Sequence, residues 1–290
     1  MLMVKTDTGL YRTDFQVLKR MKLTNFMDWF CDLEKYNIIV SPQKQIYRSI
    51  CRNIGTTCRK INCWCGIDIE IPKAINEQTL RIFESQILDS DLLSLPEYES
   101  GEIIAVAESN KITENVLLLD WSPTKRCNYD CSYCPPTVHD NHSPLPDLAE
   151  LKQMATDILS PHKNRRVRIS ISGGEPTLWP DLLLFVQHLD SMLKRKRIRI
   201  MTNGTASIQR LIELQQYSRL IVSLHHEYVS DKLLNKFLDF LNKTPHTTKV
   251  SFKMFQGHNF DDFVTQASKH DFVYISDNVP IVDKETSEWT

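Results

Sequence analysis

The second half of the chain alternates short apolar runs with longer stretches that carry apolar residues at helical spacing. The short runs predict six strands, at 117–122, 167–172, 198–201, 220–224, 250–255 and 272–276. The longer stretches predict five helices, at 148–159, 180–193, 207–217, 231–242 and 260–269. Asp147 precedes the first of these helices and can cap it, because Glu150 follows three positions later.

Strands that alternate with helices imply parallel β/α units joined by right-handed crossovers. Six strands are too few for a closed barrel of eight, so the sequence predicts an α/β fold built as a partial (β/α)6 TIM-type barrel over 115–277. Residues 278–290 are expected to form a C-terminal tail. In such folds the chemistry gathers at the carboxyl ends of the strands, and the unusual motifs of this sequence fall there.

The first hundred residues follow a different pattern, which predicts a small cysteine-rich N-terminal lobe over 1–100. Residues 37–40 and 46–51 predict a β-hairpin, and the polar stretch 88–102 is expected to link the lobe to the barrel. The lobe holds five of the eight cysteines of the chain, at positions Cys31, Cys51, Cys58, Cys63 and Cys65.

Composition and charge limit the binding partners and the cellular compartment that we expect. The 290 residues carry a net charge of −1, so no overall field favours nucleic acid or an anionic membrane. The basic runs at 163–168 and 194–199 precede strands and are expected to be solvated surface at the end away from the chemistry. The longest apolar runs are too short to span a membrane and the start lacks a signal-peptide core, so a cytoplasmic protein is expected.

The three cysteines outside the N-terminal lobe lie in one predicted loop. Cys127, Cys131 and Cys134 follow the first predicted barrel strand with the spacing Cys-x3-Cys-x2-Cys. Clustered thiolates without a histidine partner favour a soft metal centre, either iron–sulfur or zinc. A [4Fe–4S] cluster held by three thiolates keeps one iron open for a substrate or cofactor. The alternatives are a zinc loop with a distant fourth ligand, or a cysteine-rich turn that binds no metal.

Three further motifs end the next three predicted strands: ISGGEPTL at 171–178, MTNGT at 201–205 and SLHHE at 223–227. With these motifs, the sequence resembles the radical S-adenosylmethionine (SAM) enzyme superfamily over roughly residues 115–276. The combination of Cys-x3-Cys-x-aromatic-Cys with GGEP at the following strand end is highly specific. The run VSFKMFQGHN at 250–259 departs from the Gly-x-Ile-x-Gly type of pattern often seen on the fifth strand.

The resemblance implies a role for each matching residue. The three loop cysteines would bind a [4Fe–4S] cluster with an open iron site, and Tyr133 would lie near the adenine of SAM. The methionine amino group of SAM would be held by Gly173, Gly174, Glu175 and Pro176. Asn203 and Ser223 would contact the ribose or the carboxylate. His225 or His226 could face SAM or the substrate, or could be a hydrogen-bonded structural histidine.

The implied activity is reductive cleavage of SAM to a 5′-deoxyadenosyl radical, which abstracts hydrogen from an unactivated carbon. An electron donor such as flavodoxin or ferredoxin would supply the electron. The five N-terminal cysteines resemble the auxiliary-cluster (SPASM or twitch) modules, although those normally follow the barrel, and Gln45 stands where they commonly have glycine.

The auxiliary-cluster resemblance implies a second [4Fe–4S] cluster held by four of the five N-terminal cysteines; a structural zinc site or unligated cysteines are the alternatives. It also implies that the substrate is a peptide or protein side chain. A sugar or nucleotide substrate is the alternative within the superfamily. A non-catalytic iron–sulfur or zinc protein that only binds a partner is the alternative outside it.

Overall fold

The structure of the chain, a computed structural model, describes residues 1–23, 25–26, 28–31, 33–47, 71–132, 134, 139–194, 196–243, 250–255 and 260–279. The chain separates into two compact units. Unit 1 comprises Met1–Ile39, Ile46–Leu119 and Arg165–Val167, and unit 2 comprises Val40–Gln45, Asp120–Asn164 and Arg168–Thr290. Within the described ranges, no helix is both long enough and apolar enough to cross a membrane.

The larger sheet has eight strands in the order β13-β12-β11-β10-β9-β8-β4-β5. Six of them confirm the strands predicted for the second half of the chain: β8 (Val116–Trp121), β9 (Arg166–Ile171), β10 (Lys196–Thr202), β11 (Arg219–Leu224), β12 (Val250–Phe255) and β13 (Val273–Val279). Neighbouring strands from β10 to β13 pair in parallel. The α/β fold with a parallel sheet is therefore confirmed, and strands in sequential order are consistent with a partial barrel.

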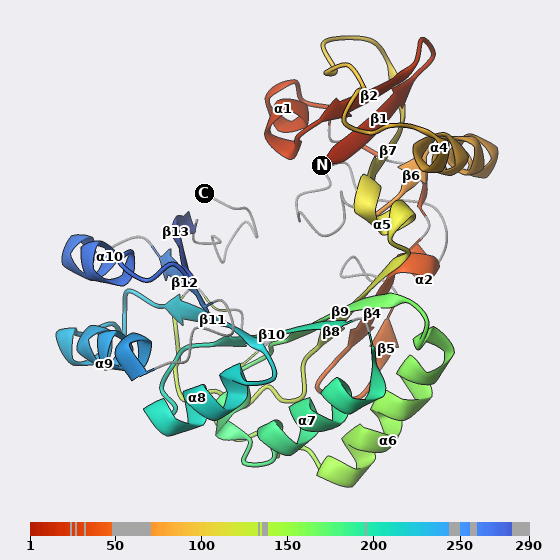
Figure 1. Cartoon of the computed structure of the whole chain (residues 1–290). Coiled ribbons are helices and arrows are strands. Elements are labelled where there is room, and N and C mark those ends of the chain that lie inside the picture. The colour runs from red at the N-terminus through yellow and green to blue at the C-terminus, as the bar shows by residue number, and fades with distance from the viewer. Residues whose placement is uncertain are drawn as a thin grey trace. The chain divides into compact units, whose positions relative to one another are not determined.

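The five predicted helices are also present, and Figure 1 shows α6, α7, α8 and α9 on one face of this sheet. Asp147 caps the first of them by accepting a hydrogen bond from the Glu150 amide, and Ser207 caps α8 in the same way through the Arg210 amide. The helices are α6 (Leu148–Leu159), α7 (Leu182–Met192), α8 (Ile208–Gln215), α9 (Asp231–Lys243) and α10 (Asp261–Ala267), with short 3-10 turns η1 (Ser160–His162) and η2 (Pro176–Leu178).

The two faces of the parallel sheet differ in chemistry. Alternate residues on each strand, such as Ile169 and Ile171 on β9 and Val222 on β11, are fully buried. The core residues of α7, including Leu182 and Phe185, are equally buried. Because side chains alternate across a strand, the residues between these positions lie on the opposite, inner face of the sheet. That face carries serines, arginines and a lysine, and the candidate site lies on it.

Unit 1 contains a second sheet, with the strand order β2-β1-β7-β6-β3 and antiparallel pairing. Its strands are β1 (Leu2–Thr6), β2 (Leu10–Thr13), β3 (Phe30–Cys31), β6 (Lys73–Ala74) and β7 (Ile103–Glu108). Its helices are α1 (Phe15–Arg20), α2 (Leu33–Tyr36), α4 (Glu77–Asp89) and α5 (Ser109–Thr113). Met3 packs with Phe83 of α4, whereas Leu2 and Val4 pack with Phe26, so apolar side chains cover both faces of this sheet.

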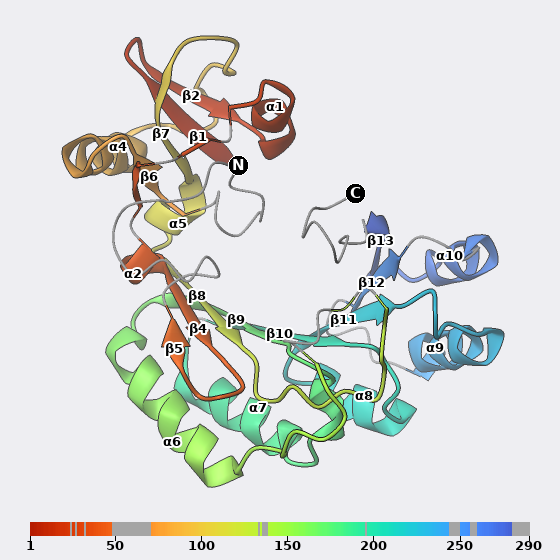
Figure 2. The same ribbon diagram turned by 180° about the vertical axis from the view of Figure 1, so that it is seen from behind.

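The predicted hairpin and linker differ from expectation. The hairpin strands β4 (Asn37–Val40) and β5 (Ile46–Tyr47) extend the eight-stranded sheet beside β8, as Figure 2 shows, rather than joining the lobe sheet. The prediction of a linker at 88–102 is wrong. Helix α4 covers its start, Tyr98 is buried in the core of unit 1, and the Tyr98 amide donates to the Arg12 carbonyl at 2.9 Å. Backbone hydrogen bonds hold the acidic, proline-containing stretch 88–102 against β2. The polarity of the stretch does not reveal these bonds.

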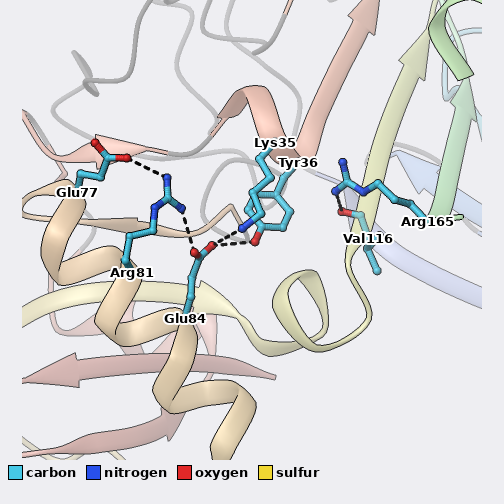
Figure 3. Close-up of polar contacts among 7 residues, drawn as sticks. All are labelled: Lys35, Tyr36, Glu77, Arg81, Glu84, Val116 and Arg165. Atoms are coloured by element: carbon cyan, nitrogen blue, oxygen red, sulfur yellow. Dashed lines mark hydrogen bonds and ion pairs between the residues drawn. The ribbon is translucent and has the colours of Figure 1, made fainter. Parts of the chain in front are cut away.

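A buried carboxylate ties α2 to α4 in unit 1 (Figure 3). Glu84 Oε1 accepts from the Tyr36 hydroxyl at 2.8 Å and from Lys35 Nζ at 3.0 Å, while Oε2 accepts from Arg81 Nη1 at 2.9 Å. Burial alone would raise the pKa of Glu84, but these three hydrogen bonds outweigh it and hold the pKa below its ordinary value. The aromatic ring of Tyr36 also lies 5.9 Å from the Arg165 guanidinium.

Candidate active site

A cavity of about 190 Å³ lies in unit 2, where the loop after β8 meets the carboxyl ends of β9, β10 and β11. Its position fits the rule that active sites of β/α barrels gather at this edge. Most of the residues singled out in the sequence line it. The lining residues are Cys127, Tyr129, Cys131, Cys134, His139, Ser172, Gly173, Gly174, Glu175, Met201, Thr202, Asn203, Ser223 and His225.

The three loop cysteines lie together on this cavity, as their spacing predicts. The loop is fixed by backbone hydrogen bonds: the Cys127 amide donates to the Asp140 carbonyl at 2.6 Å, and the Cys134 amide donates to the Cys131 carbonyl at 3.0 Å. Burial raises the pKa of the Cys127 thiol, and the nearby charge of Glu175 adds to that effect. A bound metal would reverse this preference, because coordination stabilises the thiolate.

The glycines of the GGEP motif allow two backbone segments to touch. The Gly174 amide donates to the Thr124 carbonyl at 3.0 Å, which pairs the end of β9 with the start of the cysteine loop. A Cβ on Gly174 would lie 2.3 Å from the carbonyl oxygens of Lys125 and Arg126, and Gly173 has a φ of +116°. The sequence suggested that these glycines admit a ligand; in the structure they first admit the loop that carries the cysteines.

Glu175 joins the ends of two strands. Its Oε1 accepts from the Thr177 amide at 2.9 Å, the Thr177 hydroxyl at 2.6 Å and the Thr202 hydroxyl at 2.7 Å. Its Oε2 accepts from the Asn203 amide at 2.6 Å. Burial raises the pKa of this carboxyl, and the hydrogen bonds offset part of that rise. A carboxylate oxygen has two lone pairs, so Oε2 keeps capacity for one further donor.

Asn203 lies next to Glu175 and connects the MTNGT motif with the cysteine loop. Its Nδ2 donates to Asn128 Oδ1 at 2.9 Å, and Asn128 Nδ2 donates to the Thr205 hydroxyl at 3.0 Å. Asn203 Oδ1 accepts from the Thr205 amide at 3.1 Å. Asn128, which sequence reasoning did not single out, stands between two of the cysteines and therefore fixes their loop to the end of β10.

The SLHHE motif wraps the other side of the cysteine loop. His225 Nδ1 lies 3.6 Å from Cys131 Sγ, and its ring packs edge-on against Tyr129 with centroids 5.9 Å apart. Burial lowers the pKa of His225 to about 4, so this imidazole is neutral near pH 7. His226 is not among the residues that line the cavity, and its Nε2 lies 4.0 Å from Glu227 Oε1.

Two more residues of this segment hold the loop from outside. Tyr228 stacks on Tyr129 with centroids 4.1 Å apart, and its hydroxyl accepts from the Asp130 amide at 2.9 Å. Glu227 Oε2 accepts from the Ser132 amide at 2.9 Å. The cysteine loop is thus held by side chains that follow β10 and β11 and by backbone amides at the end of β9.

His139 belongs to the polar stretch 139–144 that follows the cysteine loop, and this stretch could either reach over the site or be a plain polar loop. In the structure His139 is buried, lines the cavity and places Nε2 3.1 Å from Asp130 Oδ1. The signal available in the sequence was its position five residues after Cys134, but loop polarity alone explained it equally well.

Ser223 lines the cavity at the end of β11. Two other predicted residues are described but are not among those that line the cavity. Pro176 is buried at the start of η2. Cys31 is buried at the end of β3 and packs with Tyr36 and Ile71. Five predicted site residues are outside the part of the chain that the structure describes: Cys51, Cys58, Cys63, Cys65 and Tyr133.

The donor set on the cavity fits an iron–sulfur cluster. Three thiols from one short loop face a common space, and thiolates are the ligands that such clusters require. Each thiolate of a cubane binds a different iron, so the three sulfurs need not converge on a point. The described residues contain no group of three or more His, Cys, Asp and Glu side chains gathered as ligands for one metal ion.

Comparison with known proteins adds independent findings. The model of the Radical SAM superfamily matches residues 121–270. The GTP 3',8-cyclase of Campylobacter jejuni (strain RM1221) is 30% identical over 83 residues, which are 29% of this chain and 26% of the cyclase. Molybdenum cofactor biosynthesis protein 1 of Bos taurus is 26% identical over 173 residues, which are 55% of this chain and 26% of that protein.

The chain thus spans about a quarter of the length of these curated relatives. Among solved structures, Streptococcus suis SuiB bound to S-adenosylmethionine is 18% identical, with a TM-score of 0.43. The match covers 71% of this chain and 54% of SuiB.

Proposed function

The chain belongs to the radical SAM superfamily, whose model matches just over half of its residues, and we propose that it reductively cleaves SAM at a [4Fe–4S] cluster. The observation that carries this proposal is the meeting of Cys127, Cys131 and Cys134 with the GGEP strip on one cavity. When bound, the cluster and SAM supply a one-electron cleavage of a carbon–sulfur bond, which yields a 5′-deoxyadenosyl radical that abstracts hydrogen from the substrate.

The residues of the chain bind and orient. The three thiolates would hold the cluster and leave one iron for SAM. Glu175 holds the ends of β9 and β10 together, and the remaining capacity of its Oε2 would accept the methionine ammonium beside Gly173. Asn203 and Ser223, both on the cavity, would contact the carboxylate or ribose of SAM. Pro176 would shape this strip, and Tyr133 would lie near the adenine.

The substrate that we propose is a peptide or protein side chain, on the strength of the resemblance of the N-terminal cysteines to auxiliary-cluster modules. One observation favours a second candidate. The 30% identity with a protein named GTP 3',8-cyclase, although it extends over only 83 residues, supports a nucleotide substrate. In either case an electron donor such as flavodoxin or ferredoxin would reduce the cluster.

A second [4Fe–4S] cluster on the N-terminal cysteines is part of the proposal. Cys31 is the member of this group that the structure describes, and it is buried against Tyr36 and Ile71. Four of the five cysteines would be the ligands. A structural zinc on Cys51, Cys58, Cys63 and Cys65 is the competing assignment.

Anaerobic reconstitution of the full chain tests the proposal. With SAM and dithionite, the protein should form 5′-deoxyadenosine, and either a peptide pool or GTP should accelerate its formation. Metal analysis should give about eight iron and eight sulfide per chain for two cubanes, whereas about four of each with one zinc would favour the zinc lobe. A preparation with a full cluster that forms no 5′-deoxyadenosine would instead identify a binding protein.

A further inference from the structure

Basic side chains line the inner face of the barrel sheet. On β9, Arg168 alternates with the buried Val167 and Ile169, so its side chain is on the face opposite the helices. On β10, Arg199 alternates in the same way with Ile198 and Ile200. The two basic runs expected to be solvated surface thus extend into the strands, and part of each contributes to the face that bears the active-site cavity.

The strand register places further cations on the same face. Arg219 of β11 is the register partner of Arg199, and Lys253 of β12 is the register partner of Ser223. Because residues paired in adjacent strands share a face, Lys253 lies on the cavity side, about 4.8 Å along the sheet from Ser223. Ser223 itself lines the cavity. Lys253 is therefore at the cavity margin, on the strand side away from the cysteine loop.

Serines orient two of these arginines. Arg199 Nη2 donates to Ser170 Oγ at 3.1 Å, and Arg219 Nη2 donates to Ser251 Oγ. A serine hydroxyl accepts from a guanidinium N–H without carrying a negative charge. The described positions of this face include the carboxylate of Asp120 on β8. The basic residues there are Arg168, Arg199, Arg219 and Lys253, so they outnumber it.

The charges around Lys253 are positive as well. No described carboxylate forms an ion pair with it within 4 Å. Burial lowers the pKa of Lys253, and the positive charge of Arg199 lowers it further. A partly desolvated cation is stabilised when an anion binds beside it.

We propose that Lys253 binds an anionic group of the substrate, a phosphate or a carboxylate, beside the site where SAM is cleaved. This inference rests on the proposed function. The inference limits the class of substrate. A phosphorylated small molecule such as a nucleotide, or an acidic peptide, supplies the anionic group that Lys253 would bind, whereas a neutral sugar or an uncharged side chain does not. The two sources of negative charge share one chemistry and are separated by experiment.

Equilibrium binding to the cluster-loaded full chain tests the inference, with inorganic pyrophosphate and succinate as probes at constant ionic strength. Lys253→Met keeps the length of the buried stem and removes the charge. We expect it to raise the dissociation constant of the preferred probe about tenfold, which corresponds to about 1.4 kcal/mol. Lys253→Arg should restore binding. Lys232→Gln removes a charge from the exposed start of α9 and should leave binding unchanged.

Each result has one meaning. If pyrophosphate binds more tightly, the anionic group of the substrate is a phosphate. If succinate binds more tightly, it is a carboxylate. If neither probe binds the wild-type chain, or if Lys253→Met binds both as tightly as wild type, the inference is overturned. It is also overturned if Lys253→Met weakens SAM binding alone, because the lysine would then serve the carboxylate of the cofactor.

The proposed function fails independently of these results. Reductive cleavage of SAM by the wild-type chain is measured without any probe, so a chain that cleaves SAM but binds neither anion refutes only the anion site. A chain that binds an anion through Lys253 but never cleaves SAM refutes the radical chemistry. Circular dichroism of every variant confirms that a loss of binding is not a loss of fold.

Discussion

The buried carboxylate of Glu175 accepts a hydrogen bond from the backbone amide of Asn203, with 2.6 Å between Oε2 and the nitrogen. This single contact links the GGEP motif at the end of β9 to the MTNGT motif at the end of β10. Asn203 in turn donates to Asn128 between the loop cysteines. Three motifs that are far apart in the sequence therefore form one hydrogen-bonded unit around the cavity.

Replacing Glu175 with glutamine should break this unit. One carboxylate oxygen would become an NH2 donor, and in either orientation it would face an N–H or O–H that also donates. We expect a loss of about 1–3 kcal/mol of stability, the usual cost of a buried unsatisfied group, together with weaker SAM binding. Thermal unfolding and SAM titration measure the two effects. Glu213→Gln, at a half-exposed position of α8, is the control and should change neither.

Gly174→Ala should disrupt the cysteine loop more than the fold. The added Cβ would lie 2.3 Å from two backbone carbonyls, which cannot move aside like a flexible side chain. We expect the iron content after reconstitution to fall severalfold while the far-ultraviolet circular dichroism stays close to wild type. Gly9→Ala is the matched control, because its Cβ would meet the Tyr11 ring at an ordinary 3.5 Å. Full iron loading of Gly174→Ala would show that the close approach is unimportant.

The His225 imidazole should tune the cluster through Cys131. A thiolate can only accept a hydrogen bond, so the neutral ring would donate from Nδ1 across the 3.6 Å that separates it from Cys131 Sγ. Hydrogen bonds to sulfur ligands raise the reduction potential of a cluster. His225→Phe keeps the aromatic contact with Tyr129 and removes the donor. We predict a more negative midpoint potential in an anaerobic redox titration, and an unchanged potential would show that this contact does not persist in the loaded protein.

The Glu84 network predicts a pH-dependent stability of unit 1. The folded-state pKa of this carboxyl lies below its ordinary value of 4.5 because its hydrogen bonds outweigh burial. Its contribution is therefore fully present above pH 4.5 and is lost as the pH falls through the lower folded-state pKa. Glu84→Gln should cost about 1.5–3 kcal/mol near pH 7, as expected for hydrogen bonds to charged groups, and the cost should shrink under acidic conditions.

A control on the same helix isolates that effect. Glu77 forms a 3.2 Å ion pair with Arg81, but its side chain is 62% exposed. Glu77→Gln should therefore cost about 0–1 kcal/mol. Urea unfolding of both variants at several pH values measures the difference. Equal costs for the two variants would mean that the buried hydrogen bonds contribute no more than a surface pair.

The parallel sheet could be predicted because its signals are local. Each strand is a short run that contains apolar residues, and the caps Asp147 and Ser207 occur directly before the helices that they start. The motifs at the strand ends were equally local, and parallel topology brings strand ends to one edge of the sheet. Knowing the order of the strands was therefore enough to predict that the cysteines and the GGEP motif meet.

The remaining features depend on contacts between distant segments. The stretch 88–102 resembles a linker in composition, yet the Arg12 amide bonds the Pro96 carbonyl at 2.9 Å and fixes it to β2. His139 is in a polar stretch of the sequence, yet its side chain is buried and lies 3.1 Å from Asp130. The basic runs appeared to be surface until the pleat placed Arg199 on the inner face. None of these partners is close in the sequence, so periodicity and composition could not reveal them.

The most direct test of the central claim is electron paramagnetic resonance of the anaerobically reduced, reconstituted chain, recorded with and without SAM. We predict a [4Fe–4S] signal that changes when SAM is added, because one iron of the cluster held by Cys127, Cys131 and Cys134 is open to it. Cys127→Ala should lose that SAM-sensitive signal and form at least about 100-fold less 5′-deoxyadenosine, an effect in the range of removing an essential group. If no part of the signal responds to SAM, or if the SAM-sensitive signal survives in Cys127→Ala, the open iron site at this loop is refuted.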